Sequence, residues 1–163
     1  MYAMGLQHIT LLPFADLGGA VAPPYVIVSG KKVMRSWSVV WPEATIRATP
    51  KGSVTSELFV QAMIRWAEWT RAEHKLPMYQ PLILVADSGG GALLHLSTDF
   101  TLACVSRNVR PFYLGPHSTK GHMGLDQEPN AVAERTWQDI RRVSPHMSSL
   151  EALDVAHEVW DAA

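Results

Sequence analysis

The sequence contains little cysteine, little net charge and no long apolar run, and each shortage excludes a class of protein. Its single cysteine, Cys104, allows no internal disulfide and favours an intracellular location over secretion. The net charge of −1, from 14 Lys and Arg against 15 Asp and Glu, lacks the basic excess of an independent DNA-binding domain. We expect neither a signal peptide nor a membrane-spanning helix, because residues 1–8 carry no basic and apolar leader and no apolar run approaches about 18 residues.

The remaining composition is typical of one globular domain. Hydrophobic residues make up 47% and charged residues 18% of the 163 positions, which supplies a core and gives no sign of disorder. No internal repeat, low-complexity tract or linker divides the sequence. We therefore expect a single domain that spans residues 1–163.

Hydrophobic patterning favours strands in the first third of the chain. Residues 8–14 and 25–30 each predict a strand, and the turn residues between them indicate a hairpin with a wide connection. Residues 31–52 are harder to assign: "WSVVW" (37–41) and "ATIRAT" (44–49) are candidates for further short strands, punctuated by Pro42, Pro50 and Gly52.

Helices and strands alternate in the rest of the chain. The clearest helix begins at a hydroxyl cap within residues 53–56 and carries apolar side chains at three- and four-residue spacing to about His74. The unbroken apolar run "PLILVA" (81–86) is typical of a strand buried on both faces of a sheet. This alternation predicts a mixed α/β sheet flanked by helices. The later elements are expected as a helix over 97–108, a strand in 109–115 and a helical region from about Leu125 that ends in a helix over 148–161.

Asp87 stands at the carboxyl end of the strand predicted from "PLILVA", where such sheets usually place their sites. A carboxylate is a hard oxygen ligand suited to Mg²⁺, and two or three together can hold the ions used in phosphoryl transfer. Alternatively, Asp87 is a turn acid that caps the glycine-rich loop after it. A third interpretation is a phosphate-binding loop at Gly89–Gly91, although it has neither the Walker lysine nor a GxGxxG pattern.

A second set of polar residues lies in "PHSTKGHMGLDQE", a loop that leads into a helix. Asp126 is either a metal ligand or an ordinary acid at a helix N-terminus, where the dipole favours negative charge. On spacing alone, the ordinary acid is the simpler explanation. The neighbouring His117, His122 and Glu128 lack the cysteines or third histidine of known zinc spacings.

Taken together, this order of acids, strands and helices resembles the DDE superfamily endonuclease domain of pogo/Tigger-like transposases. The resemblance covers residues 8–137. "LILVADSGGGALLHLS" matches the family's "LLLDNHxSHLS" when three residues are inserted before His95, and "LGPHSTKGHMGLD" matches "LPPHTSHLLQPLD". The other segments that resemble the family, in order, are "HITLLPFADLGGAVAPPYVIVSGKK", "PKGSVTSELFVQAMIRWAEW" and "RTW".

The resemblance implies a ribonuclease-H-like fold in which three acids hold two Mg²⁺ or Mn²⁺ ions that promote cleavage and joining of DNA. By position, Asp87 matches the second acid and Asp126 the third. The first acid is absent, because the sequence starts just before the segment that follows the family's first strand, and Asp16, Glu57 and Asp99 fall on the wrong elements. The resemblance further implies DNA as a partner and a nuclear or otherwise intracellular location.

The missing strand has a structural consequence. In a ribonuclease-H-like sheet the first strand is central, so its neighbours must pair directly, recruit residues 1–7 or borrow a strand from another chain by self-association. The sequence departs from the family motifs at Ser88, Gly89, Lys120, Met123 and Gly124 as well.

Three functional hypotheses remain open from the sequence. The first is a truncated DDE endonuclease domain that is inactive alone and binds divalent ions weakly. The second is a domesticated or degenerate remnant that binds nucleic acid or protein without cutting. The third is an unrelated α/β domain that binds a phosphorylated small ligand through Gly89–Gly91. Residues 138–163 are expected to be helical and to pack on the domain.

Overall fold

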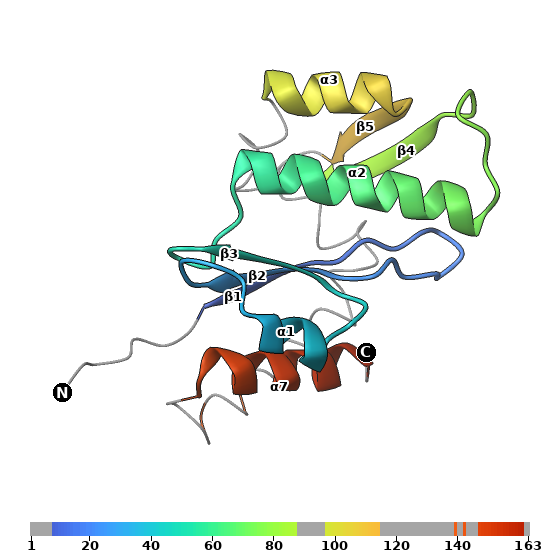
Figure 1. Cartoon of the computed structure of the whole chain (residues 1–163). Coiled ribbons are helices and arrows are strands. Elements are labelled where there is room, and N and C mark those ends of the chain that lie inside the picture. Colours follow the sequence, from blue (N-terminus) through green and yellow to red (C-terminus); the bar gives the residue numbers. More distant parts are fainter. Residues whose placement is uncertain (1–7, 88–96, 115–138, 140–141, 143–146, 162–163) are drawn as a thin grey trace. The chain divides into compact units, whose positions relative to one another are not determined.

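The computed structural model describes residues 8–87, 97–114, 139, 142 and 147–161. Within these ranges, five strands form two small sheets, accompanied by the helices α1, α2, α3 and α7 (Figure 1). The predicted α/β class is therefore confirmed. Contacts divide the chain into two compact units, one drawn from residues 1–13, 23–54 and 125–163 and the other from 14–22 and 55–124.

The first unit contains a three-stranded sheet with β2 at its centre. Strand β1 (Ile9–Leu12) runs antiparallel to β2 (Tyr25–Ser29), which confirms the predicted hairpin. Strand β3 (Thr45–Thr49) runs parallel to β2 on its other side, which confirms the strand predicted from "ATIRAT". Four of the five β2 residues are buried, as expected for the central strand of a sheet.

The strand predicted from "WSVVW" is wrong, because these residues belong to helix α1 (Arg35–Val40) and its C-cap. Trp37 and Trp41 are both buried, whereas the side chain of Val39 between them is 73% exposed. Residues four apart lie on one face of a helix, so α1 buries both indoles together. A helical crossover also allows β3 to lie parallel to β2, which a tight turn does not.

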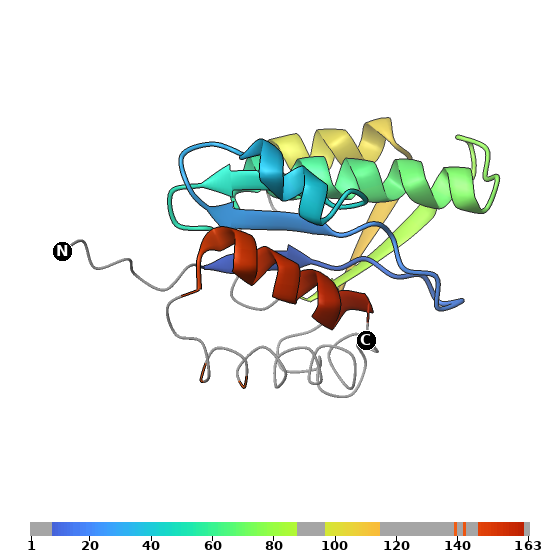
Figure 2. The ribbon, with the colours of Figure 1, turned by 60° about the horizontal axis from the view of Figure 1, so that its bottom comes forward.

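Helices α1 and α7 (Ser149–Asp161) complete the core of the first unit, and the predicted C-terminal helix is confirmed. Figure 2 shows both helices in front of the sheet. The Trp41 ring stacks on the His157 ring with 4.9 Å between centroids, which ties α1 to α7. The buried residues of this core are Val26, Val28, Trp37, Trp41, Ile46, Leu153 and Ala156.

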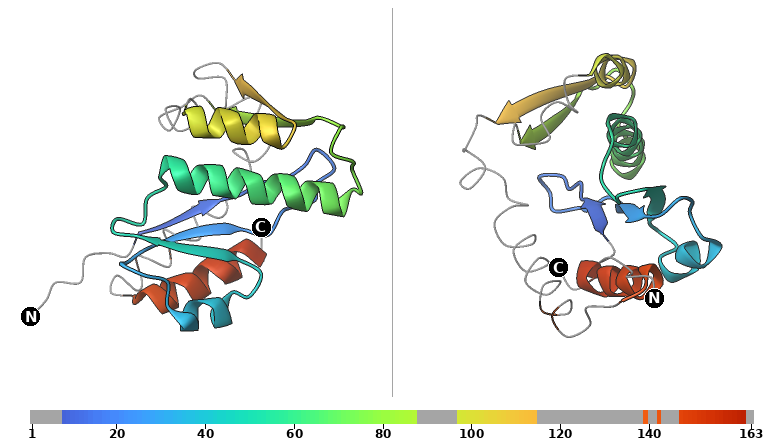
Figure 3. Two further views of the ribbon diagram at one scale, coloured as in Figure 1. Left: turned by 45° about the horizontal axis from the view of Figure 1, so that its top comes forward. Right: turned by 90° about the vertical axis from the view of Figure 1, so that its left-hand side faces the viewer.

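The second unit contains two capped helices and a parallel pair of strands. Helix α2 (Ser56–Glu73) begins after Thr55, whose side chain accepts a hydrogen bond from the Leu58 amide. Helix α3 (Thr98–Ser106) begins in the same way after Ser97. Both predicted helices are confirmed. They lie side by side (Figure 3) and are joined by packing of the Phe59 and Phe100 rings, 5.6 Å apart.

Strand β4 (Leu82–Asp87) pairs in parallel with β5 (Val109–Leu114), as predicted from the alternation of helices and strands. The expectation that β4 is buried on both faces is wrong. Leu82, Leu84 and Ala86 are buried, but Ile83 and Val85 are 67% and 44% exposed. Helix α3 packs against the pair from one side, so alternate β4 side chains remain in solvent.

Direct pairing between the two neighbours of the family's first strand, which here are β1 and β4, is not seen among the described residues. In the ranges that the structure describes, β1 pairs with β2 and β4 pairs with β5, and the two pairs belong to separate sheets. Residues 1–7, the other intramolecular candidate for the gap, lie outside those ranges. The ribonuclease-H-like arrangement remains a prediction. None of the helices in the described ranges is long and apolar enough to cross a membrane.

Candidate functional site

Asp87 is the last residue of β4 and lies opposite Leu114, the last residue of β5. Because the strands are parallel, their carboxyl ends lie at the same end of the sheet, where α/β proteins usually bind ligands. The predicted strand-end position of Asp87 is therefore confirmed. The burial of Leu82, Leu84 and Ala86 against the helical side fixes the strand that carries it.

The other predicted site residues lie outside the described residues, among them Asp126, His117, His122, Glu128 and Gly89–Gly91. The approach of Asp126 to Asp87 therefore remains a prediction. Within the described ranges, no three His, Cys, Asp or Glu residues are grouped so as to hold a metal. The two predicted ligands are carboxylates, and hard oxygen donors of this kind fit Mg²⁺ or Mn²⁺ rather than a soft metal.

Two polar side chains hold the loop that leads into β4. The Arg71 guanidinium donates to the carbonyl oxygens of Pro77, at 2.7 Å, and Gln80, at 3.0 Å, and also to that of Arg107, at 2.8 Å. Three carbonyl acceptors on one guanidinium give a charge-assisted network that joins α2, the loop and the end of α3. Nothing in the sequence pattern singled out Arg71 for this role.

Asn108 completes this arrangement from the other side of the loop. Its side-chain amide donates to the carbonyl oxygens of Met78, at 3.1 Å, and Tyr79, at 2.9 Å. Its own carbonyl accepts from the Leu82 amide at the start of β4, at 3.0 Å. Asn108 has a φ of 49°, a left-handed conformation that asparagine tolerates better than most residues. The start and register of β4, and with them the position of Asp87, are set by this contact.

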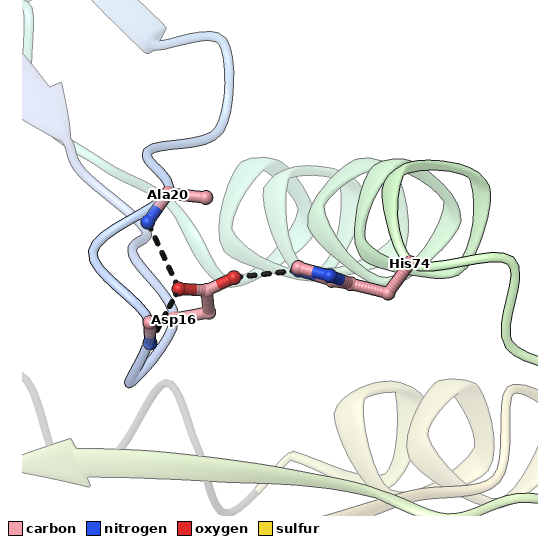
Figure 4. A network of polar contacts seen from close by, with 4 residues as sticks. Asp16, Ala20 and His74 are labelled. Carbon is pink, nitrogen blue, oxygen red and sulfur yellow. Dashed lines mark hydrogen bonds and ion pairs between the residues drawn. The ribbon is translucent and has the colours of Figure 1, made fainter.

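Asp16 lies in the turn after β1, and there it forms a polar network (Figure 4). One carboxylate oxygen accepts from the backbone amides of Gly18 and Ala20, at 2.8 and 2.9 Å. The other oxygen lies 2.6 Å from Nε2 of His74, the C-cap of α2. The Ala20 amide and, to a lesser degree, His74 and Gly18 hold the pKa of Asp16 below its usual value, against an opposing effect of desolvation.

The turn and helix α2 are joined at a second point, where the Phe14 and Trp66 rings stack with centroids 5.7 Å apart. The pattern "ADLGG" predicted the turn, because Asp and Gly favour it. It could not predict the histidine partner, which lies 58 residues away in the sequence. Asp16 and His74 therefore join the turn after β1 to the C-terminus of α2.

Among the described residues, the side chains of Cys104 and Tyr113 have raised pKa values. Burial raises the pKa of the Cys104 thiol from 9.0 to about 11, so the thiolate needed for nucleophilic attack is scarce near neutral pH. Burial also raises the pKa of Tyr113, with a smaller effect from Cys104. Neither residue is activated as a nucleophile or general base.

No family model and no curated protein matches the chain. The chain is similar to a chain in the cryo-EM structure of the simian T-cell lymphotropic virus intasome in complex with PP2A regulatory subunit B56 gamma, with a TM-score of 0.45 and 15% sequence identity. The alignment covers 96% of this chain and 47% of that chain, so this chain spans less than half of that protein's length. At this TM-score we draw no conclusion about fold or function from the likeness.

Proposed function

We propose that this chain is a domain derived from a DDE transposase that binds one divalent cation weakly, contacts nucleic acid and does not cleave DNA by itself. The observation that carries the proposal is that Asp87 is the final residue of β4, at the carboxyl end of a parallel strand pair. This is the kind of position in which α/β sheets present ligand-binding groups, and the resemblance assigns the second metal-binding acid to it.

Asp87 and Asp126 are the residues proposed to hold Mg²⁺ or Mn²⁺. When bound, such an ion acts as a Lewis acid that polarises a phosphodiester and lowers the pKa of its bound water. The two-metal reaction needs ligands for both the attacking and the leaving oxygen. The sequence offers two of the family's three acids, so one weakly held ion and no strand cleavage are the expected behaviour.

The proposed nucleic-acid contact is weak as well. Phosphate contacts dominate DNA affinity, and each basic side chain that neutralises a phosphate adds to it. With a net charge of −1 the chain lacks a general attraction for DNA. We expect weak binding that is detectable at low salt, and self-association as a means of gathering more contacts. A nuclear location belongs to the same proposal.

The direct test is a plasmid-nicking assay on the purified chain with Mg²⁺ or Mn²⁺, run beside a DNA-binding assay at low salt. The account predicts no nicking above background, and weak DNA binding that Asp87→Asn leaves in place. Robust metal-dependent nicking that disappears in Asp87→Asn would show a complete nuclease site and refute the proposal. Absence of DNA binding at low salt would remove its nucleic-acid part.

A further inference from the structure

One edge of strand β4 is unpaired among the residues that the structure describes. The Leu82 amide donates to the carbonyl oxygen of Asn108, the residue just before β5, at 3.0 Å, so the Leu82 backbone groups face β5. Successive residues of a strand present their backbone groups to opposite edges, so Leu84 and Ala86 face β5 too. The N–H and C=O groups of Ile83 and Val85 face the other edge. No backbone group of the described ranges pairs with them there.

Residues 82–86 of this edge carry none of the usual protection against strand pairing, and the charged Asp87 ends the strand. Proteins blunt exposed edges with proline, with charged side chains or with bulges. On β5, Pro111 lies opposite Leu84 and turns its missing N–H to the outer edge, which interrupts that edge. On β4, residues 82–86 include neither proline nor charge, and the side chains of Ile83 and Val85 are 67% and 44% exposed. The outer edge of β5 is therefore interrupted by Pro111, whereas residues 82–86 of β4 leave their outer edge available for pairing.

We propose that the free edge of β4 binds β4 of a second copy of this chain, antiparallel, about a two-fold axis through Leu84. In this register Ile83 lies opposite Val85 of the second copy, and Val85 lies opposite Ile83 of the second copy. Both are hydrogen-bonded pairs, so four N–H···O bonds form between backbone groups that have no backbone partner among the described residues. The product is a continuous four-stranded sheet in the order β5-β4-β4-β5.

The edge is self-complementary in this register. Ile and Val are β-branched, and their cross-strand pairs stabilise antiparallel sheets. Leu84 meets its own copy on the covered face of the sheet, and Asp87 falls beyond the paired residues. A register centred on Val85 instead places the Asp87 carboxylate opposite Ile83, which is less favourable. The absence of charge at residues 82–86 matches this stretch to itself rather than to a charged partner. This inference stands independently of the proposed metal site.

The test is sedimentation equilibrium of the full chain across the micromolar range, with charged variants of the edge. Ile83→Lys and Val85→Glu each place a charge against an apolar side chain, twice per dimer, and should weaken dimerisation about tenfold or more. The double variant Ile83→Lys/Val85→Glu places each new lysine opposite a glutamate of the second copy, and should restore dimerisation. Val105→Lys is the matched control, because Val105 is 74% exposed on α3, and it should leave the dimer unchanged.

A further variant separates edge pairing from side-chain packing. Val85→Pro removes an N–H that faces the free edge and none that faces β5, so it should abolish dimerisation while the circular dichroism spectrum stays unchanged. A chain that remains monomeric throughout overturns the proposal, and so does a dimer that tolerates Val85→Pro. If both single variants dissociate the dimer but the double variant does not restore it, the proposed register is wrong.

Discussion

Gly52 is the position at which a single methyl group should be most disruptive. It is buried and has a φ of 68°, in the left-handed region that disfavours residues with a Cβ atom. A Cβ atom there would lie 3.0 Å from the Ser29 amide nitrogen and in steric overlap with the His8 carbonyl oxygen. These two atoms are joined by a 3.0 Å hydrogen bond at the end of the β1–β2 ladder. Gly52→Ala should therefore strain the backbone and push apart the sheet of the first unit.

The size of the effect follows from two contributions. A left-handed backbone costs a non-glycine residue about 1–2 kcal/mol. Overpacking against backbone that cannot move away adds about 1–3 kcal/mol. We therefore expect Gly52→Ala to lower the free energy of unfolding by about 2–5 kcal/mol.

Gly19 supplies the matched control, because its φ of 88° is also left-handed but a Cβ atom would meet nothing within 4 Å. Gly19→Ala should cost only the backbone contribution, about 1–2 kcal/mol. Urea unfolding followed by circular dichroism measures both variants against the unchanged chain. Equal losses for the two alanines would refute the reasoning, since the steric overlap at Gly52 would then have no consequence.

Three further predictions concern polar and titratable side chains. The pKa of Asp16 is lower in the folded protein than its ordinary 3.8, so its ionised form stabilises the fold above that pH, and this stabilisation is lost as the pH falls below it. In urea unfolding over the acid range, the free energy of unfolding should therefore fall less with decreasing pH in Asp16→Asn than in the unchanged chain. With a pKa raised to about 11, Cys104 has about a hundredfold less thiolate at pH 8 than it would with a pKa of 9.0. A disulfide reagent should therefore label Cys104 at least about a hundredfold more slowly in the folded chain than in the urea-unfolded chain. Arg71→Met leaves three carbonyl acceptors without their donor and should destabilise the protein by about 2–4 kcal/mol in urea unfolding, whereas Arg65→Met, at an exposed position of the same helix, should cost less than about 0.5 kcal/mol.

Local signals in the sequence predicted most elements correctly. Helix α2 was indicated by its hydroxyl cap and by apolar spacing, and both survive in the structure as the Thr55 cap and the buried Phe59, Met63 and Trp66. Strand β4 was indicated by its apolar run, and with it the strand-end position of Asp87. These signals succeed because capping and periodic burial are decided within a few residues of the chain.

The errors arose where distant residues decide the outcome. "WSVVW" has strand-like composition, but burial of Trp37 and Trp41 on one face favours a helix. The run "LILVA" does not reveal whether one face or two will be covered, because that depends on which helices pack on the strand pair. The contact between Asp16 and His74, 58 residues apart, has no local signal at all.

Binding of Mn²⁺ tests the central claim most directly. Electron paramagnetic resonance titration should be carried out on the unchanged chain, on Asp87→Asn and Asp126→Asn, and on Asp99→Asn as a control acid in the first turn of α3. The account predicts one weak site that either Asp87→Asn or Asp126→Asn removes and that Asp99→Asn leaves intact. Unchanged Mn²⁺ binding in both Asp87→Asn and Asp126→Asn, or no binding by the unchanged chain at millimolar Mn²⁺, would contradict it.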